Sequence, residues 1–214
     1  MNIYLYVRRG TTPAAGVDHR QQRSQQGMHP VVERAGSAAE LPDWARCGKG
    51  RRAHGVRVGD LLFSWAVRLE LPDSEQVRWR AVGVLHDALK DAPLAELRDL
   101  ASGDWPDPVV HAPACADRLA ADGVEDRALL DAIRYHPVGH PALDDLGEYL
   151  ILADYLEPGR NGNLSKRDRL RGRLPEDRQK VMTIVLRERF NRLLRKKRPL
   201  MRCSVDFWNR LVAG

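Results

Sequence analysis

Cysteine is scarce in this chain of 214 residues, and its thiols are isolated from one another. Cys47, Cys115 and Cys203 form no Cys-x-x-Cys pair. Structural zinc sites usually take cysteines in closely spaced pairs, and small secreted domains are often held together by disulfides. The sequence therefore favours a reduced, cytoplasmic chain whose metal ligands, if it binds metal, are not thiolates.

Long apolar runs are also lacking. No run approaches the roughly 20 apolar residues that a helix needs to cross a bilayer. Met1–Val7 has neither the basic start nor the long apolar stretch of a secretory signal. An apolar content of 43% can still support a core. We therefore expect one domain of ordinary size with appendages at its ends and no membrane partner.

Positive charge is concentrated towards the C-terminal end. Residues 160–210 hold 17 Lys/Arg against 5 Asp/Glu, whereas the rest of the chain holds 18 against 24. A basic segment beside an acidic body suits an anionic partner, either a polyphosphate or a nucleic acid. A solvated helix face explains the same charges equally well.

Apolar residues recur at helical intervals from about residue 50 onwards, and nothing strand-like follows residue 8. The expected fold is all-α. Asp73 and Gln76 have capping-box spacing. One predicted helix starts near residue 50, and the last long one starts at Pro175. Between them we expect four helices, which run from Asp73 to Asp87, from about His111 to Gly123, from Glu125 to His136 and from Leu146 to Leu156. The predicted inner side of the helix that starts at Pro175 consists of Val181, Ile184, Val185, Leu193 and Leu194. We expect residues 1–45 to be a flexible or irregular leader, 46–160 a helical domain, and 161–214 basic C-terminal helices packed on the same domain.

His86 and Asp87, adjacent at the end of an apolar run, combine an imidazole with a carboxylate. Alone the pair means little, but further potential ligands occur where helices can converge on it. Asp154 lies in an aliphatic stretch, where a buried carboxylate costs several kcal/mol unless a cation compensates it. A salt bridge to an arginine is the alternative for Asp154. The six candidate ligands are His54, His86, Asp87, His111, His136 and Asp154.

Imidazoles and carboxylates suit iron, manganese, zinc or similar divalent ions. A carboxylate has two oxygens, so Asp87 can bridge two ions. His86, His54 and Asp154 would complete the first site, leaving His111 and His136 for the second. The sequence thus predicts a binuclear centre with open positions for water and substrate.

Four segments resemble the HD-domain superfamily of metal-dependent phosphohydrolases, and more narrowly the symmetrical bis(5'-nucleosyl)-tetraphosphatases. They are Leu85–Lys90, His111–Pro113, Ala132–His136 and Ala153–Pro158. The resemblance spans roughly residues 50–160. It implies an HD-domain helical bundle carrying a basic C-terminal extension, a di-iron centre (with manganese, magnesium or zinc as other candidates), and hydrolysis of diadenosine tetraphosphate to two ADP.

The chain departs from the family pattern after the fourth histidine. It has Pro137-Val138 where the family usually has a hydroxyl-bearing residue, and His140 where arginine is common. Because these positions lie close to the expected substrate, the departure bears on substrate choice more than on metal binding.

In the expected mechanism, a hydroxide held between two cations bridged by Asp87 attacks a phosphorus atom of the polyphosphate. Lys90, about one helical turn after Asp87, is expected to neutralise phosphate charge. Arg134 and Arg160 are further phosphate-binding candidates. For these three residues the alternatives are a surface lysine and ordinary ion pairs.

The sequence leaves two other functions open. An HD phosphohydrolase of a mononucleotide, deoxynucleotide or cyclic nucleotide would keep all six ligands. A nucleic-acid-binding protein with a vestigial metal site would use residues 187–198, which hold seven Lys/Arg. The number of subunits is open as well.

Overall fold

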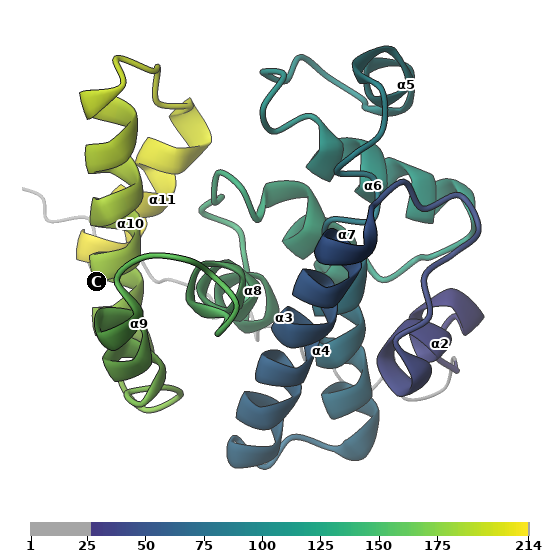
Figure 1. Ribbon diagram of the computed structural model, residues 1–214, viewed down its shortest axis with the longest axis horizontal. Helices are drawn as coiled ribbons and strands as arrows, with labels where there is room; N and C mark the ends of the chain where they lie inside the picture. The colour runs from purple at the N-terminus through teal and green to yellow at the C-terminus, as the bar shows by residue number, and fades with distance from the viewer. Residues whose placement is uncertain (1–26, 214) are drawn as a thin grey trace, which may run out of the picture.

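The computed structural model describes residues 27–213 of the chain, and within this range it contains α-helices and no strand (Figure 1). The predicted all-α fold is confirmed. The helices are α2 (Pro30–Ala38), α3 (Lys49–Arg68), α4 (Asp73–Leu85), α5 (Leu94–Leu100), α6 (His111–Ala121), α7 (Arg127–Tyr135), α8 (Asp145–Leu156), α9 (Leu164–Arg171), α10 (Arg178–Arg195) and α11 (Arg202–Ala213).

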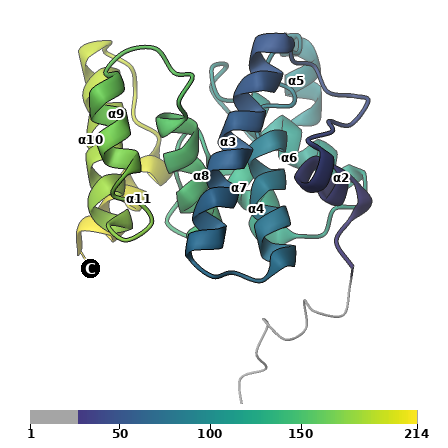
Figure 2. The ribbon, with the colours of Figure 1, turned by 60° about the horizontal axis from the view of Figure 1, so that its bottom comes forward.

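Helix α8 occupies the middle of the molecule. It lies between the α3–α4 pair on one side and the group α9, α10 and α11 on the other (Figures 1 and 2). Almost all of its residues are buried, including the aliphatic run from Leu150 to Leu152. This explains why its sequence is nearly apolar all round, as expected of a helix enclosed by neighbours.

Glycines allow α3 and α4 to pack with their backbones in contact. A Cβ added at Gly83 would lie 2.5 Å from the backbone N and Cα of Gly59, and one at Gly55 would lie 3.0 Å from the carbonyl oxygen of Val84. This close approach brings His54 on α3 beside His86, which directly follows α4. Their ring centroids are 5.3 Å apart.

We expect Gly83→Ala to destabilise the protein. The added methyl group would force the two helices apart, and overpacking of this kind costs about 1–3 kcal/mol, more than the gain of up to about 1 kcal/mol in helix propensity. Gly50→Ala on α3 is the control, because a Cβ there meets nothing within 4 Å. Urea unfolding measures both variants. A Gly83→Ala protein as stable as the wild type would contradict the packing argument.

The structure corrects the predicted leader over Pro30–Ala38, which form α2 rather than an irregular segment. Val32 and Ala35 are fully buried, and Gly36 packs against Val77 of α4. The small residues that made this stretch look irregular permit the close contact. Residues 1–26, including any strand at Met1–Val7, lie outside the described residues.

Two local predictions are also wrong. Asp73 is the first residue of α4 rather than its cap, and the Gln76 side chain donates to the carbonyl of Leu71 at 2.8 Å. Leu194 is 59% exposed, so it does not belong to the inner side of α10. The buried side of that helix is formed by Val181, Met182, Val185 and Leu186.

The C-terminal helices contribute to the common core. Phe207 of α11 is fully buried, and α10 contacts both α8 and α11. Among the described helices, none combines the length and the apolarity needed to span a bilayer.

Candidate metal centre

Two groups of buried histidines and acids share one carboxylate. His54, His86 and Asp87 form the first group, and Asp87, His111 and His136 form the second. Within each group, the potential ligand atoms all lie within 4.8 Å of one another. The shared residue is the one predicted to bridge two ions.

Helix ends bring these residues together. His86 and Asp87 directly follow α4, His136 directly follows α7, and His111 is the first residue of α6. His54 lies in the second turn of α3. The His86 and His136 ring centroids are 4.9 Å apart, and those of His111 and His136 are 5.5 Å apart.

Asp154, in the last turn of α8, reaches the same place. Its Oδ1 lies 3.1 Å from Nε2 of His54 and 3.9 Å from Nε2 of His86. All six predicted ligands therefore converge.

Backbone carbonyls fix the orientation of two rings. Nδ1 of His86 lies 2.7 Å from the carbonyl oxygen of Gly83, and Nδ1 of His136 lies 2.8 Å from that of Ile133. A carbonyl oxygen can only accept, so each Nδ1 donates its proton and each Nε2 is left to face the centre. Metal-binding histidines are commonly held in this way.

His54 lies between two acids. Its Nδ1 is 3.1 Å from Oε1 of the buried Glu157, and its Nε2 is 3.1 Å from Oδ1 of Asp154. A neutral ring has one proton and cannot donate to both. A cation near Nε2 and Asp154 would resolve this conflict while Glu157 holds Nδ1.

The centre contains buried polar atoms without a hydrogen-bond partner of good geometry. Nε2 of His86 and Oδ1 of Asp87 are buried, and no group in residues 27–213 hydrogen-bonds to either. That carboxylate oxygen lies 3.2 Å from Nε2 of His111 and 3.6 Å from Nε2 of His136. Buried polar atoms rarely remain unsatisfied, so these residues fit bound divalent cations.

Protonation states also favour metal binding. Burial lowers the pKa of His136 to about 4 and lowers that of His111, so both rings are neutral at pH 7. Burial alone would raise the pKa values of Asp87 and Asp154, but surrounding imidazoles, with Arg160 beside Asp154, hold both well below their usual range. Neutral imidazoles and ionised carboxylates are the forms that coordinate metal.

Basic side chains surround the two acids. Nζ of Lys90 lies 2.9 Å from Nε2 of His111, and burial lowers the pKa of this lysine. Arg160 donates to the carbonyl of Asp154 at 2.8 Å and pairs with its carboxylate. Lys90 and Arg160 are thus brought to the centre. The salt bridge considered as the alternative for Asp154 exists beside its contact with His54.

Arg134 is not brought to the centre. Its Nη2 pairs with Oδ1 of Asp117 at 2.6 Å, across α7 and α6. This is the ordinary ion pair that was its alternative, and we leave Arg134 out of the proposed substrate site. The following residue, Tyr135, stacks on His140, with ring centroids 4.3 Å apart.

Sequence reasoning missed three residues of the centre. Arg51, whose Nη1 lies 3.3 Å from Oδ2 of Asp87, precedes His54 by three positions and so shares its helix face. Glu157 follows Asp154 by the same interval. These spacings could have revealed both residues. Arg189 comes from α10, and its sequence position carries no signal of this kind.

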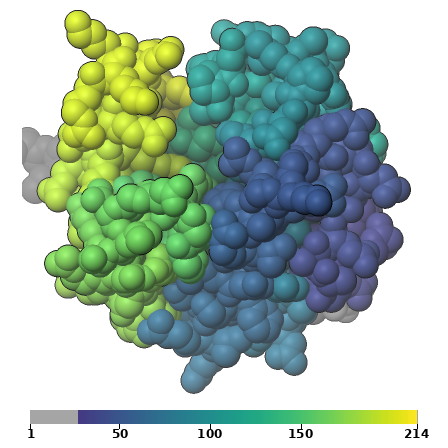
Figure 3. Space-filling view, viewed as in Figure 1, coloured from purple at the N-terminus to yellow at the C-terminus, as the bar shows by residue number. Residues whose placement is uncertain are grey.

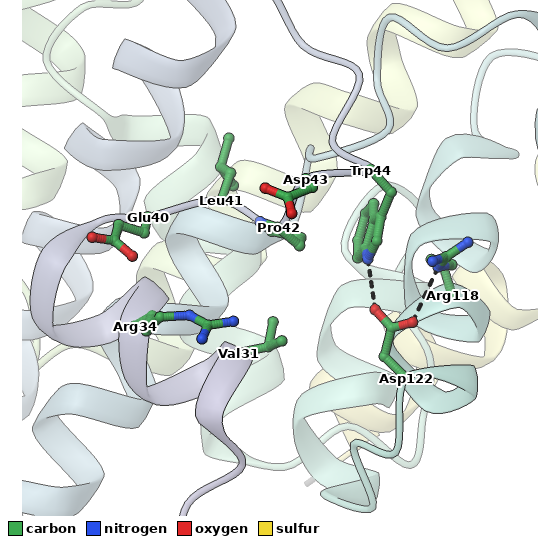
Figure 4. A pocket seen from close by; sticks show the side chains of 9 residues that line it. All are labelled: Val31, Arg34, Glu40, Leu41, Pro42, Asp43, Trp44, Arg118 and Asp122. Carbon is green, nitrogen blue, oxygen red and sulfur yellow. Dashed lines mark hydrogen bonds and ion pairs between the residues drawn. The ribbon is translucent and has the colours of Figure 1, made fainter.

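The hollow of about 720 Å³ lined by residues of α2, the following segment and α6 is a different place (Figure 4). Trp44 lies in it and donates to Asp122 at 2.6 Å, and Arg118 pairs with the same acid at 3.2 Å. None of the candidate ligands lines this hollow.

The chain is similar to known proteins both in structure and in sequence. No family model matches the chain. The crystal structure of a predicted HD superfamily hydrolase from Clostridium acetobutylicum superposes with a TM-score of 0.68 and 24% identity, covering 78% of this chain and 90% of that one. The fold is therefore that of an HD superfamily hydrolase, as the sequence predicts.

The relatives found by sequence carry a more specific name than the structural neighbour does. A Staphylococcus aureus protein named symmetrical bis(5'-nucleosyl)-tetraphosphatase is 30% identical over 121 residues, which cover 51% of this chain and 60% of that protein. The chain thus spans less than two thirds of this relative. A Bacillus subtilis protein of the same name is 28% identical over 77% of this chain and 90% of its own length. The chain is similar in sequence to proteins named symmetrical bis(5'-nucleosyl)-tetraphosphatase, and the predicted resemblance is confirmed.

Proposed function

We propose that this chain is a metal-dependent phosphohydrolase that cleaves dinucleoside tetraphosphates symmetrically, converting diadenosine tetraphosphate and water to two ADP. The observation that carries the proposal is the pair of ligand groups sharing Asp87, with unpartnered buried atoms on His86 and Asp87. The names of the homologues supply the substrate.

The proposed centre holds two cations. His54, His86, Asp87 and Asp154 would bind one, and Asp87, His111 and His136 the other. Four imidazoles with two carboxylates favour iron or zinc over magnesium, which prefers oxygen ligands. We propose iron, with manganese and zinc next. When bound, such cations stabilise phosphoryl charge and lower the pKa of water from about 15.7 towards about 7.

The chain's own residues orient this chemistry. The carbonyls of Gly83 and Ile133 and the carboxylate of Glu157 hold three imidazoles in fixed directions. Lys90 and Arg160 place positive charge beside the carboxylates, where the phosphate chain would lie. Symmetrical cleavage adds the oxygen of water to an inner phosphorus atom and breaks its bond to the middle bridging oxygen, which leaves as part of the second ADP.

Replacing Lys90 with alanine is expected to lower kcat/KM by roughly 10- to 150-fold, because hydrogen bonds to charged groups contribute about 1.5–3 kcal/mol. Metal content should not change, since Lys90 contacts His111 without being a ligand. Lys49→Ala, an exposed lysine on α3, is the matched control. Metal analysis and initial rates test both variants. Loss of metal in the Lys90 variant would show that the assigned role is wrong.

Product analysis on a nucleotide panel tests the substrate. We expect ADP as the only nucleotide product from diadenosine tetraphosphate. Inorganic phosphate released from mononucleotides, without cleavage of the dinucleotide, would instead favour the alternative HD phosphohydrolase. The departure at Pro137–His140 makes this comparison necessary.

A further inference from the structure

The residues on one face of α10 change from apolar to basic along the helix. In its first half this face is apolar and buried, with Met182 and Val185 in the core. Arg189 lies four positions after Val185 and seven after Met182, so it continues the same face. The core-facing side of the helix therefore becomes cationic at Arg189.

Arg189 is where α10 meets the candidate metal centre. Its Nη1 donates to the carbonyl of His136 at 3.1 Å, and its Nη2 lies 3.5 Å from Oδ2 of Asp154. The first contact fixes the guanidinium through a backbone atom. The second places its charge at the edge of the ligand group.

Beyond Arg189 the same face carries Arg192, three positions further on, and Lys196 directly follows the last residue of α10. Both are exposed, and no carboxylate in the described part of the chain pairs with either. Two other cations of the C-terminal helices are neutralised: Arg173 lies 3.0 Å from Asp177, and Arg210 lies 2.5 Å from Glu148. Arg187, Arg195, Lys197 and Arg198 are exposed like Arg192 and Lys196, but they do not continue the face that reaches the metal centre through Arg189.

Two further observations support an open cationic surface at this place. Arg192 lies three positions after Arg189, on the next turn of the helix. Burial lowers the pKa of Arg189, and repulsion from Arg160 and then from Arg192 adds to this. Figure 3 shows a notch between the yellow C-terminal residues and the teal residues around α5 and α6. Helices α10 and α11 both lie on the C-terminal side of this notch, and α11 is the nearer of the two (Figure 1).

We propose that Arg189, Arg192 and Lys196 form a cationic track that binds the part of a phosphate chain extending outside the metal centre. Seven residues of helix span about 10.5 Å, enough for the phosphates on one side of the cleaved bond. The inference rests on the proposed function. The track would favour binding of long polyphosphates over mononucleotides, because a mononucleotide held at the metals would not reach Lys196.

The test compares two double variants of the metal-loaded protein. Arg192→Ala/Lys196→Ala removes the outer track. Lys180→Ala/Arg187→Ala removes one lysine and one arginine from exposed positions on the opposite face of α10. We expect the first to raise KM for diadenosine tetraphosphate at least about tenfold while kcat stays within about twofold, and the second to change neither.

Binding of linear tripolyphosphate, measured by calorimetry, tests the track without turnover. A tenfold weaker affinity in the Arg192/Lys196 variant alone supports the track, even if the wild type fails to cleave the dinucleotide and the proposed substrate is wrong. Equal affinities in both variants would overturn the track. The track would also be overturned if the Arg192/Lys196 variant lost binding of an RNA oligonucleotide while its tripolyphosphate binding stayed unchanged. That result would mean that this face binds nucleic acid.

Discussion

Asp87→Asn is expected to remove metal from the protein and to reduce hydrolysis of diadenosine tetraphosphate by at least about a thousandfold. Asp87 belongs to both ligand groups, so losing its charge weakens both cation sites at once. Asparagine has nearly the same size, so the buried space stays filled. Metal analysis and rate measurements on the same sample give both results.

Asp91→Asn is the matched control for this variant. Asp91 is only four residues away, half-exposed, and accepts a hydrogen bond from the backbone N–H of Gly48 at 2.9 Å. It should keep its metal and its activity. An Asp87→Asn protein with full activity after metal removal would refute the proposed mechanism.

Removing the metal with a chelator is expected to lower the melting temperature by about 5–10 °C. A ligand at 100 times its Kd stabilises the folded state by about 2.7 kcal/mol, and each kcal/mol shifts the Tm of a domain this size by about 2–4 °C. The structural reason is the buried, unpartnered pair of atoms on His86 and Asp87. Calorimetric melting with and without added metal measures the shift.

The Asp87→Asn variant serves again here, because its Tm should respond little to the chelator. Restoring Fe²⁺ or Mn²⁺ to the stripped wild type should restore the Tm. Identical melting of the stripped and reloaded wild type would mean that the buried centre binds no stabilising cation.

Most of the six ligand candidates were predictable from the sequence because they end or start a helical segment that the apolar pattern defines. His86 ends one such segment, His111 starts another and His136 ends a third. The sequence pattern places these residues at helix ends, whereas their convergence depends on how α4, α6 and α7 pack together. Asp154 stood out because a carboxylate among aliphatic residues is costly to bury without a cation or an arginine beside it.

The other residues around the centre could not be predicted, because they are brought there by tertiary contacts that leave no pattern in the local sequence. Arg134 and Arg189 both lie in helices near ligands or basic runs, yet Arg134 pairs with Asp117 whereas Arg189 reaches His136. The packing of α7 against α6 decides the first contact, and that of α10 against α8 decides the second. Helix α2 was missed for a similar reason. Gly36 looks like a helix breaker in the sequence, but in the fold its lack of a side chain permits close contact with Val77.

Metal content and nucleotide hydrolysis, measured on one preparation of the purified chain, test the central claim most directly. The account predicts about two cations per chain, with diadenosine tetraphosphate converted to ADP alone and the activity lost on metal removal. Full activity in metal-free protein would contradict it, as would a fully loaded protein that leaves the dinucleotide intact.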